Sequence, residues 1–288
     1  ASSFIEVIED RVMEDHVDLL RTVEGLVRSP DSLDREVFGT FARHLLGSHP
    51  EVLALSWNPA IRDSHRSAYE AEVLGGMQTF RIVERDSDGQ VVTAPKRDAY
   101  VFVHYIEPIE ENEGALGFNV SSNPKRKAAL DRARDSGLPT ATGRISLIQE
   151  SDNSGGFLVF LPVYETGQRT TTVDERRQYL RGYATGAFRI DDLIQESLRR
   201  QTESGIAFRI LDEAAEPGEQ LIYSHLFEAK LDASMPTNDL VAGNLAGLST
   251  TLDVVGRPLS FLFVPTPGYV AGQQTWHLWL VLASGLLV

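Results

Sequence analysis

The 288-residue chain contains no cysteine. This absence excludes disulfide bonds, thiolate catalysis and cysteine-bound zinc. It leaves the compartment open, because a chain of this length buries a core large enough to need no disulfide, even under oxidising conditions. Apolar residues make up 42% and charged residues 24% of the chain, which is typical of a soluble globular protein.

Basic residues are also scarce. The chain carries 27 Lys and Arg against 41 Asp and Glu, which gives a formal net charge of −14. Nucleic acids and anionic membrane surfaces attract clustered cations, so we do not expect this chain to bind either of them. An acidic surface of this kind mainly promotes solubility.

Catalytic and cofactor motifs are missing as well. The sequence has no P-loop, no G-x-S-x-G elbow and no HExxH pair. His44 and His49 flank a Gly-Ser turn, but their spacing does not indicate a metal site. We therefore expect no metal, no cofactor and no enzymatic activity in this segment. The remaining enzymatic alternative is a secreted hydrolase that uses the carboxylates of Glu107 and Glu110.

The two ends of the sequence differ in character. No signal peptide is visible at the start. Residues 276–288 are almost entirely apolar and begin with Trp276 and Trp279, and Trp at the edge of an apolar run is typical of a membrane interface. A full crossing needs roughly 20 residues. We expect residues 276–288 to begin a transmembrane helix; a buried C-terminal strand or helix is the alternative.

Residues 3–27 are expected to form one long helix. Ile5, Val12, Leu19 and Leu26 recur every seven residues. The stripe predicts a stalk helix that contributes to a parallel homodimer, although it could equally pack on the chain's own domain. A second amphipathic helix is expected after residue 32, and its apolar stripe is predicted to be Leu33, Val37, Phe41, His44 and Leu45.

Strands broken by a few helices fill the rest of the chain. Asn58-Pro59 is expected to end the first strand, because proline cannot extend a ladder. Asn123-Pro124 is expected to open a helix that ends at Gly137. The absence of a regular βαβ alternation predicts an α+β fold with antiparallel sheets. The expected strands are 52–57, 79–85, 91–94, 99–106, 142–149, 156–164, 182–190, 206–213, 221–225, 248–255 and 258–264, and the expected helices between them are 61–73, 123–137 and one opened by Asp191-Asp192.

A set of short segments in residues 54–188 resembles a known family. The segments are ALSWNPAI at 54–61, Arg66, Tyr69-Glu70, Arg97, Tyr100, YIEP at 105–108, Asn112, Leu116-Gly117, 119–126, Gly143, LIQ at 147–149, GFLVFLPVY at 156–164, Gly182-Tyr183, Gly186 and Phe188. Their order and spacing resemble the CHASE family, the extracytoplasmic ligand-sensing domain of bacterial receptor kinases and cyclases and of plant cytokinin receptors.

The resemblance implies a fold and a function. The fold would be a long N-terminal helix followed by two PAS-like α/β subdomains, of which the membrane-distal one holds the ligand. The implied divisions are a stalk and linking helix (1–50), the distal subdomain (51–190), the membrane-proximal subdomain (191–275) and the start of a transmembrane helix (276–288). The chain would be the periplasmic or extracellular sensor of an inner-membrane receptor with a histidine kinase, diguanylate cyclase or phosphodiesterase output.

The resemblance also bears on the ligand. Cytokinin-binding members carry an Asp that hydrogen-bonds an adenine-type ring, and the matching position here is Asn119, whose amide offers both a donor and an acceptor but no charge. A strand position that carries a small polar residue in those members is occupied here by Phe160, whose ring would narrow the cavity. Leu147 matches the residue whose backbone meets the ligand. A cytokinin is therefore not the expected ligand, and we expect another small molecule.

The predicted ligand-binding residues fall in two groups. Apolar walls with a few orienting polar groups are typical of such pockets. The wall residues are Val103, Tyr105, Leu147, Phe160 and Tyr183, and the polar ones are Asn119, Ser122, Arg97 and Arg126. Tyr105 and Phe160 could instead be core residues, and the arginines could be structural partners of Glu107 or Asp98. A ligandless protein-interaction ectodomain is the other interpretation, favoured by the bulk of Phe118 and Phe160.

Overall fold

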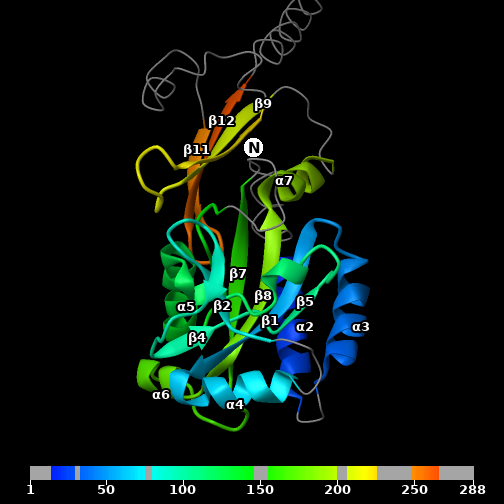
Figure 1. The fold of residues 1–288 in the computed structure, drawn as a ribbon. Helices are drawn as coiled ribbons and strands as arrows, with labels where there is room; N and C mark the ends of the chain where they lie inside the picture. Colours follow the sequence, from blue (N-terminus) through cyan, green and yellow to red (C-terminus); the bar gives the residue numbers. More distant parts are fainter. Residues whose placement is uncertain are drawn as a thin grey trace, which may run out of the picture. The chain divides into compact units, whose positions relative to one another are not determined.

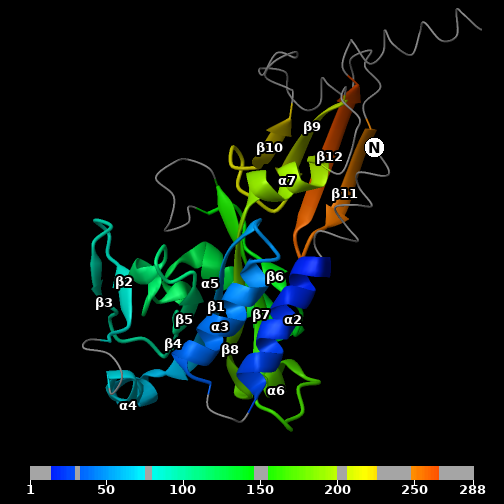
Figure 2. The same cartoon turned by 90° about the vertical axis from the view of Figure 1, so that its right-hand side faces the viewer.

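The computed structural model describes residues 14–29, 33–74, 80–145, 155–199, 206–225 and 248–265. The chain divides between residues 193 and 194 into two compact units, each with its own antiparallel sheet (Figures 1 and 2). The mixed α and β content and the antiparallel sheets confirm the predicted fold class at this level. The PAS-like character of the two parts and the domain boundaries stay predictions.

The first unit is built on a six-stranded sheet in which every pairing is antiparallel. The order is β4-β1-β8-β7-β6, and β5 pairs with β1. The strands are β1 (Val52–Arg62), β4 (Ala99–Val101), β5 (Tyr105–Glu107), β6 (Thr140–Ala141), β7 (Gly156–Tyr164) and β8 (Leu180–Arg189).

Helices cover both faces of this sheet. Helices α2 (Glu14–Arg28) and α3 (Arg35–Leu46) pack on one face, and α5 (Pro124–Ser136) packs on β6 and β7 from the other (Figure 1). The remaining elements of this unit are α4 (Asp63–Leu74), the hairpin of β2 (Val83–Arg85) and β3 (Val91–Thr93), the short 3-10 helices η2 (Glu113–Ala115) and η3 (Val120–Ser122), and α6 (Val173–Gln178).

Alternation along the long central strands separates the two faces. The Phe188 ring of β8 lies 5.0 Å from the His16 ring of α2, and a Cβ added at Gly186 would lie 3.4 Å from Leu20 of α2. Thr185 and Ala187, the residues before and after Gly186, therefore face the α5 side, because successive side chains of a strand point to opposite faces.

The first strand does not end at Pro59, so that prediction was wrong. Strand β1 continues to Arg62, and Pro59 pairs with Gly182 of β8. On its other edge, β1 pairs with β5 up to Trp57 and with β4 from Ala60 onward. Pro59 lies between these two pairings, where its missing N–H interrupts no ladder bond, and its carbonyl accepts from the Phe102 N–H at 3.4 Å.

Gly182 is required by close approach at the same point. A Cβ there would lie 2.4 Å from the Asn58 carbonyl oxygen and 2.7 Å from Pro59 Cα, which no real side chain could occupy. The glycine thus lets β8 run beside the proline of β1. The predicted strand 99–106 is also interrupted: it is split into β4 and β5.

The predicted apolar stripe of the second helix was displaced by one position. Phe38 and Ala42 are buried, at 1% and 0% exposure, whereas Val37 is 45% exposed. The helix begins at Arg35 with Asp34 as its N-cap, whose side chain accepts from the Val37 N–H at 2.8 Å. Leu33, the first residue of the predicted stripe, lies outside the helix, and the face with Phe38 and Ala42 meets the sheet in place of the predicted one.

The predicted start and end of the helix after Asn123 are confirmed. The Asn123 side chain caps α5 by accepting from the Arg126 N–H, Pro124 is the first helical residue, and Gly137 ends the helix at φ 76°. The hairpin between β2 and β3 turns at Gly89, and the Asp86 carboxylate accepts from the N–H groups of Asp88 and Gln90. These are capping and turn effects, which depend only on near neighbours in sequence.

The N-terminal helix is described from Glu14 onward, and the rest of its predicted length lies outside the described residues. Of the predicted stripe, Leu19 is 4% exposed and Leu26 is half-buried, and their neighbours Leu20, Val23 and Val27 in α2 are at most 1% exposed. The described part of the stripe therefore packs on the chain's own sheet, which is one of the two alternatives. The parallel homodimer stays a prediction.

The second unit contains a four-stranded sheet in the order β10-β9-β12-β11, and all four predicted strands are present. They are β9 (Ile206–Asp212), β10 (Leu221–His225), β11 (Leu248–Asp253) and β12 (Pro258–Pro265). Helix α7 (Ile190–Arg199) follows β8 and opens with Asp191 and Asp192, as expected. No helix in the described ranges is both long and apolar enough to cross a membrane. Residues 276–288 lie outside those ranges.

Candidate ligand-binding site

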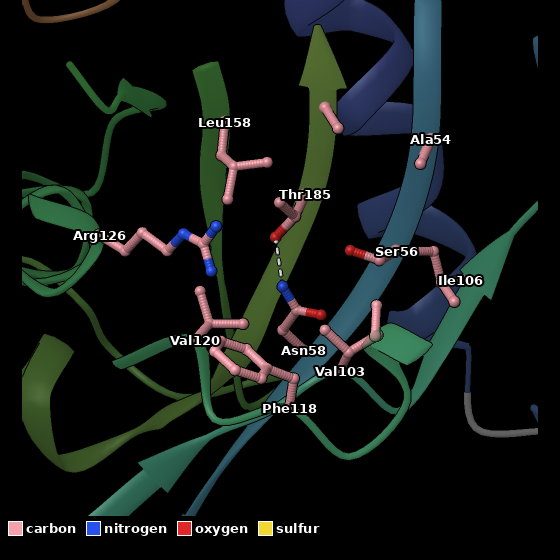
Figure 3. Close-up of a pocket in the computed structure, with 12 residues that line it drawn as sticks. Ala54, Ser56, Asn58, Val103, Ile106, Phe118, Val120, Arg126, Leu158 and Thr185 are labelled. Carbon is pink, nitrogen blue, oxygen red and sulfur yellow. Dashed lines mark hydrogen bonds between the residues drawn. The ribbon is translucent and has the colours of Figure 1, made fainter. Parts of the chain in front are cut away.

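A cavity of about 50 Å³ lies on the α5 face of the first unit's sheet (Figure 3). Its walls are residues from β1, β8, β7, α5 and the segment 103–120. They are Ala54, Ser56, Asn58, Val103, Ile106, Ala115, Phe118, Val120, Arg126, Leu158, Thr185 and Ala187. A single water needs roughly 10–15 Å³ of such space. The cavity therefore has room for several waters or for a small group of a ligand.

The polar floor of the cavity is formed by neighbouring strands. The Asn58 amide of β1 donates from Nδ2 to the Thr185 hydroxyl of β8 at 2.9 Å (Figure 3). Asn58 is 1% exposed, and its Oδ1 accepts no hydrogen bond from the part of the chain that the structure describes. A buried acceptor without a donor is costly. The Oδ1 atom therefore marks where a ligand donor or a water is expected.

Arg126 supplies a positive charge to the opposite wall. It lies in the first turn of α5, is 8% exposed, and its guanidinium is directed into the cavity (Figure 3). Its Cζ lies 5.6 Å from the centre of the Phe118 ring, a cation–π contact. Burial, and secondarily the charge of Arg85, lower the pKa of Arg126, but an arginine stays protonated at neutral pH.

The remaining walls are apolar. Val103, Ile106, Phe118, Val120 and Leu158 surround the polar floor and the guanidinium. A charge in such surroundings is weakly screened, so an anion that reaches Arg126 gains more than it would at the surface. The cavity therefore fits a small molecule that combines an acidic group with an apolar body and a hydrogen-bond donor.

The structure brings two of the nine predicted site residues into this lining, Val103 and Arg126. Phe160 and Tyr183 lie on the same sheet face, in the core beside the cavity. Phe160 is 0% exposed, and the two ring centroids are 5.9 Å apart. The Tyr183 hydroxyl donates to the Leu130 carbonyl of α5 at 3.0 Å, and burial raises the pKa of this phenol.

Tyr105 lies on the other face of the sheet. Its ring stacks on Phe38 of α3, with centroids 5.4 Å apart, and its hydroxyl donates to the Leu33 carbonyl at 3.1 Å. Tyr105 pairs with Trp57, one residue away from the cavity-lining Asn58, and alternation sends it toward α3. It therefore does not line the cavity.

Three predicted polar residues meet around Glu84 of β2. Arg97 donates to both Glu84 carboxylate oxygens, at 2.7 and 3.1 Å, and the Asn119 amide donates to the same carboxylate at 3.3 Å. The Ser122 hydroxyl donates to the Asn119 carbonyl at 2.7 Å. This network fixes the segment that carries Phe118 and Val120 into the cavity. Leu147 lies outside the described residues. The ligand-contact assignments of these residues stay predictions.

The sequence did not single out the two polar floor residues, Asn58 and Thr185. A signal for Asn58 was present: Ala54, Ser56 and Asn58 share one face of a strand. The signal was hidden because the strand was expected to end at Trp57. Thr185 had no local signal, because its partner lies 127 residues away in sequence.

The two carboxylates of the hydrolase alternative do not line the cavity. Glu107 is 4% exposed, points to the α3 face and accepts from Arg43 Nη1 at 3.0 Å, while Glu110 is exposed. Among the described residues, one group has the composition of a metal site: His16, His49 and Glu51. That group lies at the α2 face, away from the cavity, because His16 contacts Phe188 there.

Comparison with known proteins agrees with this architecture. The family model of the CHASE domain matches residues 31–223, about two thirds of the chain. Hybrid signal transduction histidine kinase A of Dictyostelium discoideum is 23% identical over 299 residues. That match takes in 96% of this chain but 14% of the kinase, so the chain spans a small part of its relative's length.

One solved structure shows a similar fold at low identity, and a second gives a weaker match. An extracellular ligand binding receptor from Desulfohalobium retbaense superposes with a TM-score of 0.51 at 9% identity, over 92% of this chain and 39% of the receptor. The periplasmic sensory domain of the Campylobacter jejuni chemoreceptor Tlp1 gives a TM-score of 0.46 at 10% identity, over 90% of each chain.

Proposed function

The chain belongs to the CHASE domain family, and on that premise we propose that it is an extracytoplasmic sensor domain that binds a small molecule between β1, β8 and α5. The observation that carries this proposal is the cavity itself, with the unpartnered Asn58 Oδ1 at its floor and the Arg126 cation in its wall. Convergent polar groups inside an apolar pocket are typical of ligand sites.

The ligand class follows from the lining. Arg126 favours a carboxylate or a similar small anion, because a guanidinium can hold its two oxygens together. Asn58 Oδ1 accepts a hydrogen bond, so the ligand needs an N–H or O–H group on the side opposite its anion. The walls around Val103 and Leu158 suit a short aliphatic or aromatic body.

The signal is proposed to pass to a larger receptor. In this proposal the domain is anchored in a membrane, works as a homodimer and controls a histidine kinase, a diguanylate cyclase or a phosphodiesterase. Ligand binding would shift a population between two packings, by no more than the difference in ligand affinity between them. The complete gene tests this: it should encode a hydrophobic span on each side of the domain and an output domain after the second span. A gene without these would contradict the receptor role.

A binding screen tests the sensor role. The purified domain is heated with members of four chemical classes: small carboxylates, amino acids, aromatic acids and adenine derivatives. A ligand at about 100 times its dissociation constant should raise the melting temperature by several degrees. We expect hits among the acids and not among neutral adenines. Calorimetry then gives the affinity and stoichiometry of each hit.

Variants locate the binding. Arg126→Met should weaken an acidic hit by at least tenfold, since it removes the cation, and Asn58→Leu should weaken it by removing the acceptor. Lys127→Met is the matched control, because Lys127 is the next residue of α5, is exposed and pairs with Asp131. Unchanged affinity in both cavity variants would place the ligand elsewhere and contradict the proposed site.

A ligandless protein-interaction domain is the second candidate. The complete burial of Phe160 beside the small cavity favours it, because a large side chain fills space that a ligand would need. In that case no compound class stabilises the domain. The double variant Asn58→Leu with Thr185→Val then leaves the interaction with the partner protein unchanged. A secreted hydrolase through Glu107 and Glu110 would instead require turnover that both Gln variants abolish.

A further inference from the structure

Three side chains from two segments that are far apart in sequence converge at the α2 face of the first unit. His16 comes from α2, and His49 and Glu51 come from the turn between α3 and β1. His16 Nε2 lies 2.9 Å from Glu51 Oε1, and His49 Nδ1 lies 3.3 Å from the same oxygen. All three potential ligand atoms lie within 4.8 Å of one another.

The surroundings of the group combine burial with access. His16 is 5% exposed and packs edge-on against the Phe188 ring, which fixes the plane of its imidazole. The side chains of Glu51 and His49 are 13% and 29% exposed, so the group is open toward solvent on the His49 side. The two imidazoles lie at 61° to one another, with centroids 6.2 Å apart, so they are not stacked and their edges meet at the carboxylate.

The spacing fits a tetrahedral ion. Zn²⁺ holds imidazole nitrogens and carboxylate oxygens at about 2.0–2.2 Å, which places neighbouring ligand atoms of a tetrahedron about 3.3 Å apart. The measured separations of 2.9 and 3.3 Å are close to this value. Two histidines and a carboxylate are a recurrent zinc ligand set, with a fourth position left for water. Here that position would lie on the exposed His49 side.

We infer that His16, His49 and Glu51 form a binding site for Zn²⁺ that fastens helix α2 to the start of strand β1. The sequence alone indicated no metal, because His16 and His49 are 33 positions apart and meet only when α2 lies on the sheet. An ion at this point would tie the first described helix to the strand that carries Ser56 and Asn58 into the cavity. It would thereby make the attachment of that helix dependent on zinc.

Calorimetric titration of the untagged, EDTA-treated and dialysed domain with ZnCl₂ tests the site. We expect saturation at one ion per chain and a rise of several degrees in melting temperature at excess zinc. MgCl₂ and CaCl₂ should give no saturable heat, because these hard ions prefer sites made entirely of oxygen ligands. The absence of saturable zinc binding at one ion per chain would overturn the inference and leave a hydrogen-bonded His–Glu group.

Single substitutions assign the ligands. His49→Ala and Glu51→Gln should each weaken zinc binding by at least tenfold, and His16→Gln should do the same. The control is His44→Ala, because His44 is an exposed histidine of the neighbouring helix α3 and lies outside the group. Should His16→Gln fail to fold, His49→Ala decides, since its side chain is partly exposed. Equal affinity in His49→Ala and the wild type would overturn the assignment.

Discussion

His104 is held neutral by its surroundings. Its ring lies 4.0 Å from that of Tyr105 and 5.5 Å from that of Tyr69, and its Nδ1 has no hydrogen-bond partner in the described ranges. Burial, and then the charge of Arg35, lower its pKa from 6.5 to about 4. The folded protein thus binds fewer protons than the unfolded chain between these two values, and its stability falls as the pH drops through that window.

Substitution of His104 should flatten this dependence. Urea unfolding of the wild type from pH 7.5 to pH 4 is expected to show a loss that His104→Phe lacks, on the order of 1–3 kcal/mol. The phenyl ring keeps an aromatic side chain beside Tyr69 without a titrating group. His65→Phe is the control, because His65 is exposed on α4 and its replacement should leave the slope unchanged. Equal slopes for His104→Phe and the wild type would contradict the burial of a neutral imidazole.

The Asn58–Thr185 bond suits a double-mutant cycle. Thr185→Val removes the acceptor of a buried amide and should destabilise the domain by about 1–3 kcal/mol. Asn58→Leu with Thr185→Val removes both partners, so it should recover much of that loss, and urea unfolding measures the coupling. Thr251→Val is the matched control: its hydroxyl bonds to Ser260 at an exposed site, and the loss should stay within about 0.5 kcal/mol. Additive effects at Asn58 and Thr185 would contradict a direct bond.

Replacement of glycine by alanine should have opposite effects on the stability of the domain at two positions of the helices. Gly25 lies inside α2, is exposed, and a Cβ there would meet nothing within 4 Å, whereas Gly137 ends α5 at φ 76° with Arg176 only 3.3 Å from an added Cβ. Gly25→Ala should stabilise the domain by about 0.5–1 kcal/mol. Gly137→Ala should destabilise it by about 1 kcal/mol, because only glycine adopts that conformation without strain. Thermal unfolding checks both, and the same sign for both variants would contradict the assigned helix ends.

The elements were predictable wherever a local cause decides them. The cap at Asn123 and the helix end at Gly137 each depend on residues within one helical turn, and each was predicted. The errors came from tertiary context. Pro59 stays in a strand because β1 changes partners beside it, and α3 packs on β1 and β5 through the face that carries Phe38 and Ala42.

The segments that form the candidate site were predictable, but most of the individual residues that line it were not. Val103 and Arg126 reach the cavity, whereas Tyr105 falls on the other face because one residue of register reverses a side chain. That register is set by the pairing of β1 with β5 and β8, between segments far apart in sequence. For the same reason the approach of His16 to His49 could not be foreseen from their spacing.

At the scale of the molecule, the two units should respond separately to damage. Asp212 of the second unit is 1% exposed and accepts from Arg257 through Nε at 2.9 Å and through Nη2. Arg257→Met leaves a buried carboxylate unpaired, at a cost of about 3–5 kcal/mol. Hydrogen exchange should then accelerate in residues 206–225 and 248–265 while β1 and β8 keep their protection. The exposed pair variant Lys127→Met should change neither, and faster exchange throughout the chain would contradict two separate units.

The alternating faces of β1 and β8 have a consequence for the evolution of the sequence. Positions 54, 56, 58, 185 and 187 line the cavity, while positions 186 and 188 touch α2. The strand pair β1–β8 thus carries two alternating sets of positions, one that lines the cavity and one that contacts α2. Under the proposed ligand-binding role, substitutions in the first set change which ligand fits the cavity, while the second set keeps its contact with α2. Ligand specificity can then change stepwise, with the packing of α2 on the sheet unchanged.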